Sequence, residues 1–365
     1  MPELPPRDRR FPCVSCGADV AFAPGTNALA CPYCGAHNEI TVDAEGVDEL
    51  DYAGHLERMG EQAEGEEVIV TPCDTCGARV EFPERVTSHN CPFCGSAVVA
   101  TGRAMTHIKP GAILPFALPR DKAKAAYQAW KKKLWFAPGD LKKASRLESR
   151  LNGVYLPYWT YDATAITDYT GQRGEYYYVT VSYTDAQGRS RTRRERRTRW
   201  YPARGRVRDT FDDLLVVATT SIERERLREL EPWDLSAVVP YDDAYLAGFR
   251  AEHYAIDLPA GFARSNELML PKIRGTIRAD IGGDTQRIGS MDSTYHAITF
   301  KHLLLPVWIA TYRYRDTLYQ VLINARTGEV VGQRPYSWMK ISLLVIVGLL
   351  VLAGIVLAIV SQQHR

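Results

Sequence analysis

All eight cysteines of the 365-residue chain fall in four CxxC pairs, each followed by glycine. Two cysteines on one tight turn place both sulfurs on the same side, and the glycine relieves the curled backbone. Two such turns complete a tetrahedral set of four thiolates, the arrangement that holds structural zinc. The sequence therefore predicts two zinc ions, held by Cys13, Cys16, Cys31 and Cys34 and by Cys73, Cys76, Cys91 and Cys94.

The two sets of cysteines belong to an internal repeat. Each copy reads CxxC, fourteen residues and then CPxCG, and a shift of 60 residues aligns the copies without a gap. Three flanking positions are also shared, namely Ala18 with Ala78, Val20 with Val80 and Phe22 with Phe82. Valine and phenylalanine alternate there as on a short strand beneath the metal. The repeat predicts two zinc ribbons, in residues 1–40 and 71–103.

The ligand sets also bear on what the ribbons do. Cysteine fills all four positions of each set, which leaves no open position for water or substrate, so each zinc is expected to be structural. The ribbons are therefore interpreted as docking modules for a protein partner. Each zinc with four thiolates carries a charge of about −2, so two sites change the formal charge of the chain from +2 to about −2. Attraction to an anionic partner must then come from a local cluster of positive charges and not from the net charge of the chain.

The segment Ile341–Val360 holds 20 residues without a charge, and as a helix it is about 30 Å long, which matches a bilayer hydrocarbon core. Tyr336 and Trp338 stand where interfacial aromatic residues are common, and Lys340 lies on the same flank. We expect a single transmembrane helix, in residues 337–361, that anchors the chain by its tail. The first dozen residues lack the apolar core of a secretory signal, and paired thiols suit a reducing compartment, so the body is expected in the cytoplasm.

Between the ribbons, residues 41–70 form an acidic linker. Eleven acidic residues and one arginine, Arg58, occur from Glu39 to Glu67. Two interpretations fit this segment. It is either a helix over Val47–Gln62, whose apolar residues recur at helical spacing, or a solvated spacer.

Residues 108–336 are rich in aromatic and β-branched residues and are expected to form an α+β body. Helices are predicted over Arg120–Leu134 and Asp243–His253, and the end of the body is predicted to be a three-stranded meander. The sequences LPYW at 156–159 and LPVW at 305–308 suggest that the body also contains a duplication.

The most unusual part of the body is a predicted hairpin, with strands Glu175–Tyr183 and Arg189–Tyr201 joined at Asp185–Gly188. Ten arginines and a single acid occur between residues 189 and 208, and tyrosines lie close by. Arginine beside aromatic residues suits contacts with phosphate, either on lipid headgroups or on nucleic acid, and we expect lipid because the anchor holds the body at a membrane. The alternative is an edge strand that uses charge to prevent aggregation. The arginines assigned to an anionic partner are Arg191, Arg193, Arg194, Arg196, Arg197 and Arg199.

Signatures of common catalytic sites are absent from the sequence. It contains no GxxxxGKS/T phosphate loop, GxGxxG turn, GxSxG elbow or HExxH pair. The histidines of the body, His107, His253, His296 and His302, are scattered along the chain. The protein is therefore expected not to be an enzyme.

The doubled CxxC/CPxCG ribbons, the LPYW and LPVW segments, the sequence NARTGEVVGQRPYS at 324–337 and the tail helix together resemble a bacterial family of membrane-anchored zinc-ribbon proteins. Members carry labels such as primosomal protein N-prime-like and replication restart helicase-like, although this chain lacks the nucleotide-binding motifs of a helicase. The resemblance implies a non-enzymatic, tail-anchored adaptor on the cytoplasmic face of the bacterial inner membrane, beside SPFH-domain and phage-shock-type stress proteins. The alternative is a nucleic-acid-binding protein at the membrane, linked to replication or repair.

Overall fold

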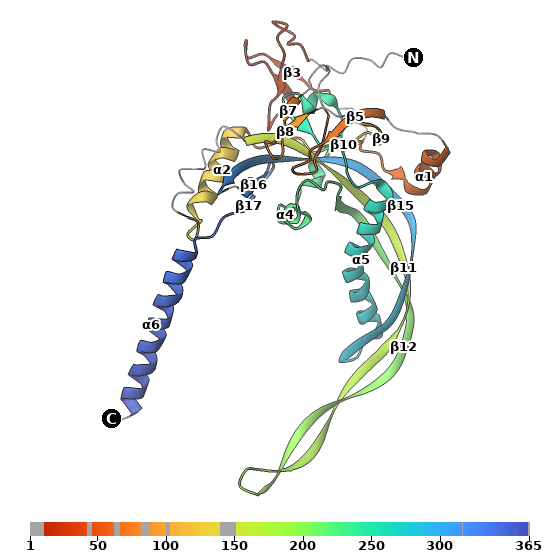
Figure 1. Ribbon diagram of the computed structural model, residues 1–365. Helices are drawn as coiled ribbons and strands as arrows, with labels where there is room; N and C mark the ends of the chain where they lie inside the picture. Colours follow the sequence, from red (N-terminus) through yellow and green to blue (C-terminus); the bar gives the residue numbers. More distant parts are fainter. Residues whose placement is uncertain are drawn as a thin grey trace.

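A computed structural model describes residues 11–41, 46–61, 66–81, 88–99, 103–138, 151–315 and 317–363. Helices and sheets both occur, so the predicted α+β class is confirmed. Figure 1 shows a curved wall of long strands, with the two cysteine ribbons at one end of it and helix α6 projecting away from the body. The described part of the chain thus consists of ribbons, a strand-rich body and a projecting helix.

Three very long strands dominate the body. β11 (Leu151–Thr184) lies in the centre and pairs antiparallel with β12 (Ser190–Val217) on one side and with β15 (Thr285–Tyr314) on the other. The pairing shifts register near Asp162 in both ladders, and bulges of this kind bend strands and increase their twist. The strands therefore curve along their length instead of forming a flat sheet (Figure 1).

Helix α5 (Leu258–Ile281) lies against these strands. Its buried residues recur at helical spacing, and Met269 and Ile273 belong to the same apolar cluster as the small Ala163 of β11. The Asp257 side chain caps the helix by accepting a hydrogen bond from a backbone N–H of the first turn. This helix was not expected from the sequence, although its capping residue and the spacing of its apolar residues fit one.

The final strands β16 (Thr317–Asn324) and β17 (Val330–Gly332) continue the sheet beyond β15, which confirms the predicted meander. Helix α2 (Arg120–Lys132) packs beside them and buries Ala123 and Tyr127. The first predicted helix of the body is therefore also confirmed.

The prediction of a helix over Asp243–His253 is wrong. Only a single 3-10 turn forms, η3 (Asp243–Leu246), in which the Asp242 carboxylate accepts a backbone N–H at 2.7 Å. The chain then turns at Gly248, whose φ of +81° favours glycine, and Arg250–Ala251 pairs with β11 as β14. Since α2 has no counterpart here, the structure does not show the duplication expected within the body.

Helix α6 (Trp338–Gln363) stands apart from the body. Its segment Trp338–Leu357 has a mean hydropathy of 2.7, and none of it is buried inside the protein. Among the described residues, this is the one helix long and apolar enough to span a membrane. Its start is held at the body, because Lys340 Nζ donates to the backbone oxygens of Trp135 and Ala137, at 3.2 and 2.7 Å.

Candidate metal centres and neighbouring surfaces

In the first ribbon, a three-stranded sheet supports the two cysteine turns. Its strands are β1 (Ala21–Phe22), β2 (Ala28–Ala30) and β3 (His37–Glu39). Gly17 and Gly35 follow the turns with a φ of +74°, a conformation that favours glycine. Each glycine N–H closes its turn by donating to the backbone oxygen of the first cysteine of the pair. The turn geometry therefore explains the CxxCG pattern.

The sulfurs of the first ribbon are spaced for one tetrahedral ion. The Sγ atoms lie 3.6 Å apart both for Cys13 with Cys34 and for Cys16 with Cys31, and all four lie within 4.8 Å of one another. An ion bound at about 2.3 Å, the usual Zn–S distance, requires sulfurs about 3.8 Å apart. The backbone N–H of Cys34 lowers the pKa of Cys31 to about 6, which favours the thiolate form of this one ligand.

The second ribbon repeats this geometry. The sulfurs of Cys73 and Cys94 lie 3.6 Å apart and those of Cys76 and Cys91 lie 3.7 Å apart, again with all four within 4.8 Å. The surrounding strands are β5 (Glu66–Pro72), β6 (Arg79–Glu81), β7 (Ser88–Asn90), β8 (Ala97–Val99) and β9 (Arg103–His107). Both predicted cysteine sets are therefore positioned to bind a metal ion, while Phe82 lies outside the described residues.

The second metal centre is enclosed by the body. Cys73, Cys91 and Cys94 are at most 3% exposed and share an apolar core with residues of the long strands and of β16, such as Leu156 and Leu322. The second ribbon is thus docked on the body of its own chain.

Each turn that carries a CxxC pair is here called a knuckle, and the knuckle of Cys91 and Cys94 shows how this docking works. Phe93 lies within the second ribbon's knuckle and is fully buried. The side-chain amides of Asn152 and Gln320 donate to the backbone oxygens of Pro92 and Phe93, at 3.2 and 3.4 Å. An apolar pocket and two amide donors therefore receive this knuckle.

The first ribbon is attached to the body by its strands and leaves both of its knuckles uncovered. The Phe22 ring packs on the Tyr245 ring with centroids 5.2 Å apart. Tyr33, the counterpart of Phe93, is 81% exposed, and Val14 on the other knuckle is 79% exposed. No part of the described chain covers the apolar face beside this metal centre.

The acidic linker is docked on the body over residues 46–61. β4 (Leu50–Asp51) pairs antiparallel with Thr299–Phe300 of β15, and α1 (Tyr52–Glu61) follows it. The His55 ring lies 5.1 Å from the ring of Phe300. Of the two interpretations of the linker, the helix is therefore correct over Tyr52–Glu61, and the solvated spacer is wrong for these residues.

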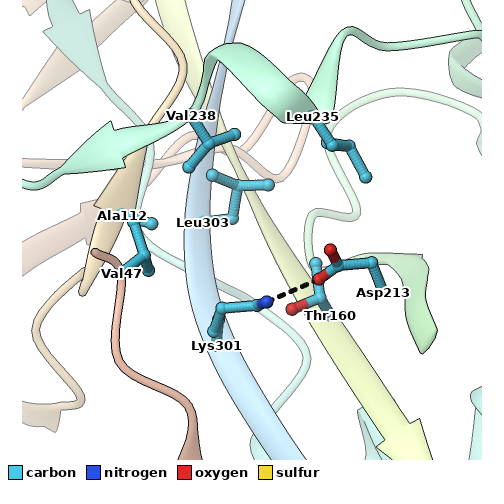
Figure 2. A pocket seen from close by; sticks show the side chains of 8 residues that line it. All are labelled: Val47, Ala112, Thr160, Asp213, Leu235, Val238, Lys301 and Leu303. Carbon is cyan, nitrogen blue, oxygen red and sulfur yellow. Dashed lines mark ion pairs between the residues drawn. The ribbon is translucent and has the colours of Figure 1, made fainter.

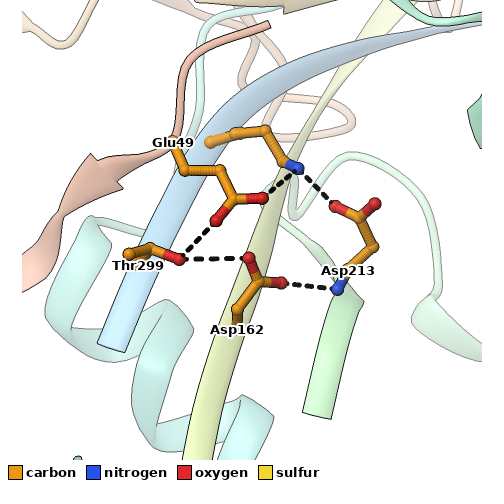
Figure 3. A network of polar contacts seen from close by, with 5 residues as sticks. Glu49, Asp162, Asp213 and Thr299 are labelled. Atoms are coloured by element: carbon orange, nitrogen blue, oxygen red, sulfur yellow. Dashed lines mark hydrogen bonds and ion pairs between the residues drawn. The ribbon is translucent and has the colours of Figure 1, made fainter. Parts of the chain in front are cut away.

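A polar network fastens the linker to the sheet (Figure 3). The Lys301 ammonium lies between two carboxylates, 3.1 Å from Glu49 Oε1 and 2.6 Å from Asp213 Oδ1. The Thr299 hydroxyl lies 2.8 Å from the Glu49 carboxylate and 3.0 Å from that of Asp162. Burial, together with the neighbouring Glu49, raises the pKa of Asp162 to about 6. Asp162 therefore takes up a proton at mildly acidic pH.

The network includes a group of three acids that was not expected from the sequence. Glu49, Asp162 and Asp212 each place a carboxylate oxygen within 4.8 Å of the others. Lys301 supplies a positive charge to Glu49, one of these three acids. We assign these acids a structural role in holding the linker.

A cavity of about 180 Å³ lies beside the network (Figure 2). It is lined by Val47, Ala112, Thr160, Asp213, Leu235, Val238, Lys301 and Leu303. The buried Thr160 hydroxyl has no hydrogen-bond partner within the described part of the chain. Because Val47 belongs to the linker, docking of the linker completes one wall of the cavity.

Three histidines that are far apart in the sequence gather between the second ribbon and the body. The His107 ring lies 4.6 Å from the His253 ring, and the Tyr254 ring lies 4.4 Å from His107 and 5.4 Å from His302. Burial lowers the pKa of His302 to about 3, and its Nδ1 donates to the backbone oxygen of Ile108 at 2.8 Å. The positions of these histidines along the chain did not predict the cluster. Within the described residues it does not form a metal-binding group, so we interpret it as interface packing.

The predicted Arg-rich hairpin joins β11 to β12, and its turn lies at Asp185–Gly188 as expected. The strands are much longer than predicted, because both continue into the three-stranded part of the sheet. The arginines assigned to an anionic partner are all exposed, namely Arg191, Arg193, Arg194, Arg196, Arg197 and Arg199.

Comparison with known proteins gives one similarity over almost the whole chain. No protein-family model matches the sequence, and no solved structure matches it. The chain is 26% identical over 347 residues to the uncharacterized protein YdjG of Bacillus subtilis (strain 168), which covers 91% of this chain and 92% of that protein. The similarity thus extends over nearly the full length of both proteins and is not confined to the cysteine ribbons.

Proposed function

We propose that the protein is a tail-anchored membrane adaptor, in which the first ribbon binds a protein partner and the second ribbon stabilises the body. The observation that carries this proposal is the difference between the two knuckles. Phe93 is fully buried in its own chain, whereas Tyr33, at the same position of the repeat, is 81% exposed. The first ribbon therefore presents a surface of a kind that this protein already uses for docking.

The docked knuckle indicates what the partner of the first ribbon offers. In the second ribbon, an apolar pocket takes up Phe93 while amide side chains donate to the knuckle carbonyls. The first ribbon offers Tyr33 and Val14 beside its own knuckle carbonyls. A partner with an apolar pocket rimmed by asparagine or glutamine side chains would complete the same contacts, and Tyr33 is the residue type that often anchors such interfaces.

The charge of the first ribbon favours a protein partner over nucleic acid. Residues 1–40 contain four acids and three arginines, which give a formal charge of −1. Four thiolates around a zinc ion make this charge about −3. This surface would repel phosphate groups.

We further propose that both metals are structural zinc and that no chemistry takes place at the ribbons, since four cysteines occupy each site. Helix α6 would hold the protein in the bacterial inner membrane, with the body in the cytoplasm, where all eight cysteines remain as free thiols or metal ligands. Lys340 at the start of the helix fits this orientation.

A photocrosslinking amino acid placed in living cells tests the proposal. We expect a crosslinker at Val14 to give a discrete protein adduct, because Val14 lies on the free knuckle of the first ribbon. Asp74 is the matched control, since it holds the same position in the second ribbon and is also exposed. Equal adducts at the two positions, or none at Val14, would contradict the proposal.

A further inference from the structure

The Arg-rich hairpin forms an arm that extends beyond the rest of the sheet. Pairing between β11 and β15 ends at Gly174 and Thr285, so residues 175–199 pair only among themselves. Ten residues of each strand belong to this arm, which gives a length of about 33 Å. Figure 1 shows the arm and α6 both extending away from the ribbons.

Neither face of the arm is covered by the described part of the chain. Strand alternation places Arg193 and Arg199 on one face and Arg194 and Arg196 on the other. Each of these guanidinium groups lies over a tyrosine ring of the opposite strand, at centroid distances from 4.2 to 5.7 Å. An isolated two-stranded hairpin is marginally stable in water, so these cation–π pairs and a binding partner would both stabilise the arm.

The arm concentrates positive charge that the rest of the protein lacks. Seven arginines and three acids give residues 175–199 a net charge of +4, twice that of the whole chain. Asp185 neutralises part of this charge at the turn through ion pairs with Arg189 and Arg191. Arg193 and Arg196 form no ion pair with the described residues, and both are exposed. Their guanidinium groups remain available to phosphate.

We infer that this arm binds acidic lipid headgroups of the membrane that α6 spans, in the leaflet that faces the body. Guanidinium groups match phosphate oxygens in geometry, and tyrosine is enriched at the headgroup level of membranes. Arginine on both faces suits an arm that is immersed among headgroups, where phosphates lie on every side. Phosphates of duplex nucleic acid would offer related chemistry, but the proposed anchoring by α6 keeps the arm close to a bilayer, which favours the membrane. The inference rests on the proposed anchoring and is independent of any partner of the first ribbon.

Hydrogen–deuterium exchange on the full chain in lipid nanodiscs tests the inference. One set of discs contains phosphatidylcholine alone, and the other contains about a third phosphatidylglycerol. We expect amide exchange in residues 175–199 to slow by on the order of tenfold in the acidic discs, because headgroup contacts oppose opening of a marginal hairpin. At 1 M salt, where the Debye length is about 3 Å, the slowing should disappear. Incorporation into the discs tests the anchor separately.

Two charge-matched variants identify the source of any protection. Arg193→Gln with Arg196→Gln removes one arginine from each face and should abolish most of the slowing. Arg204→Gln with Arg208→Gln removes two exposed arginines of the same strand outside the arm. This variant should show the same slowing of exchange as the wild type. The inference is overturned if exchange is equal in both kinds of disc or if the two variants behave alike. Protection by a 20-base-pair duplex in neutral discs, without protection by acidic lipid, would assign the arm to nucleic acid instead.

Discussion

Tyr33 and Phe93 occupy the same position in the two ribbons, directly before the fourth cysteine, yet only Phe93 is enclosed by the body. The duplication therefore produced two metal centres with different surroundings. One knuckle became part of the core, and the other remained at the surface. The energetic consequences of this difference can be measured.

Truncating the two aromatic residues should have very different effects on stability. Phe93→Ala removes a fully buried ring and is expected to lower the free energy of unfolding by about 3–5 kcal/mol. Tyr33→Ala removes an exposed ring and should change it by less than about 0.5 kcal/mol. Urea unfolding of both variants in the same detergent measures the difference. Similar losses of stability would mean that the first knuckle is covered in the folded protein.

Removing one metal ligand should likewise affect the ribbons unequally. Elemental analysis is expected to give two zinc ions for the wild type and one each for Cys16→Ser and Cys76→Ser. The Cys16 variant should retain the thermal unfolding of the body, because the first centre lies at its edge. The Cys76 variant should unfold at a clearly lower temperature, since its centre shares a core with Leu156 and Leu322. A zinc content near zero in the wild type, with its thiols oxidised, would contradict the metal assignment.

Much of this organisation could be predicted because it depends on local patterns. CxxCG spacing determines the ribbons, and an uninterrupted apolar run determines α6. The docked linker could not be predicted, since the ion pair of Glu49 with Lys301 joins residues 252 positions apart. The long strands were underestimated for a related reason. β11 is buried on both faces over Val154–Tyr161, so it lacks the alternation that identifies a half-exposed strand.

The buried Glu252 should make stability depend on pH. Burial raises its pKa to about 7, although the hydroxyls of Thr219 and Ser221 both donate to Oε2. The unfolded carboxyl has a pKa of about 4.3, so between these values the native state binds more protons than the unfolded state. This group's contribution to stability is therefore fully present below about pH 4.3 and is lost as the pH rises to about 7.

Glu252→Gln removes this titration and keeps an oxygen acceptor for the two hydroxyls. Relative to the wild type, the variant should gain up to about 3 kcal/mol in unfolding free energy between pH 4.5 and pH 8. The depressed pKa of His302 acts in the opposite direction, but it is common to both proteins and cancels in the difference. Urea midpoints measured at several pH values provide the comparison. A difference that does not change with pH would show that Glu252 is ionised throughout.

The anchoring role of α6 can be tested by charges placed at its centre. Leu350 and Val351 are exposed in the middle of the apolar segment, and none of the segment is buried against the described part of the body, where a partner could compensate a charge. Replacing both with lysine should cost about 6 kcal/mol of membrane insertion, and the protein should then be extracted from membranes by alkaline carbonate. Ser337→Lys with Met339→Lys adds the same charge at the membrane interface, beside Lys340, and should leave the protein in the membrane fraction. Extraction of neither variant would show that the body itself holds the protein on the membrane, and extraction of both would show that α6 does not span it.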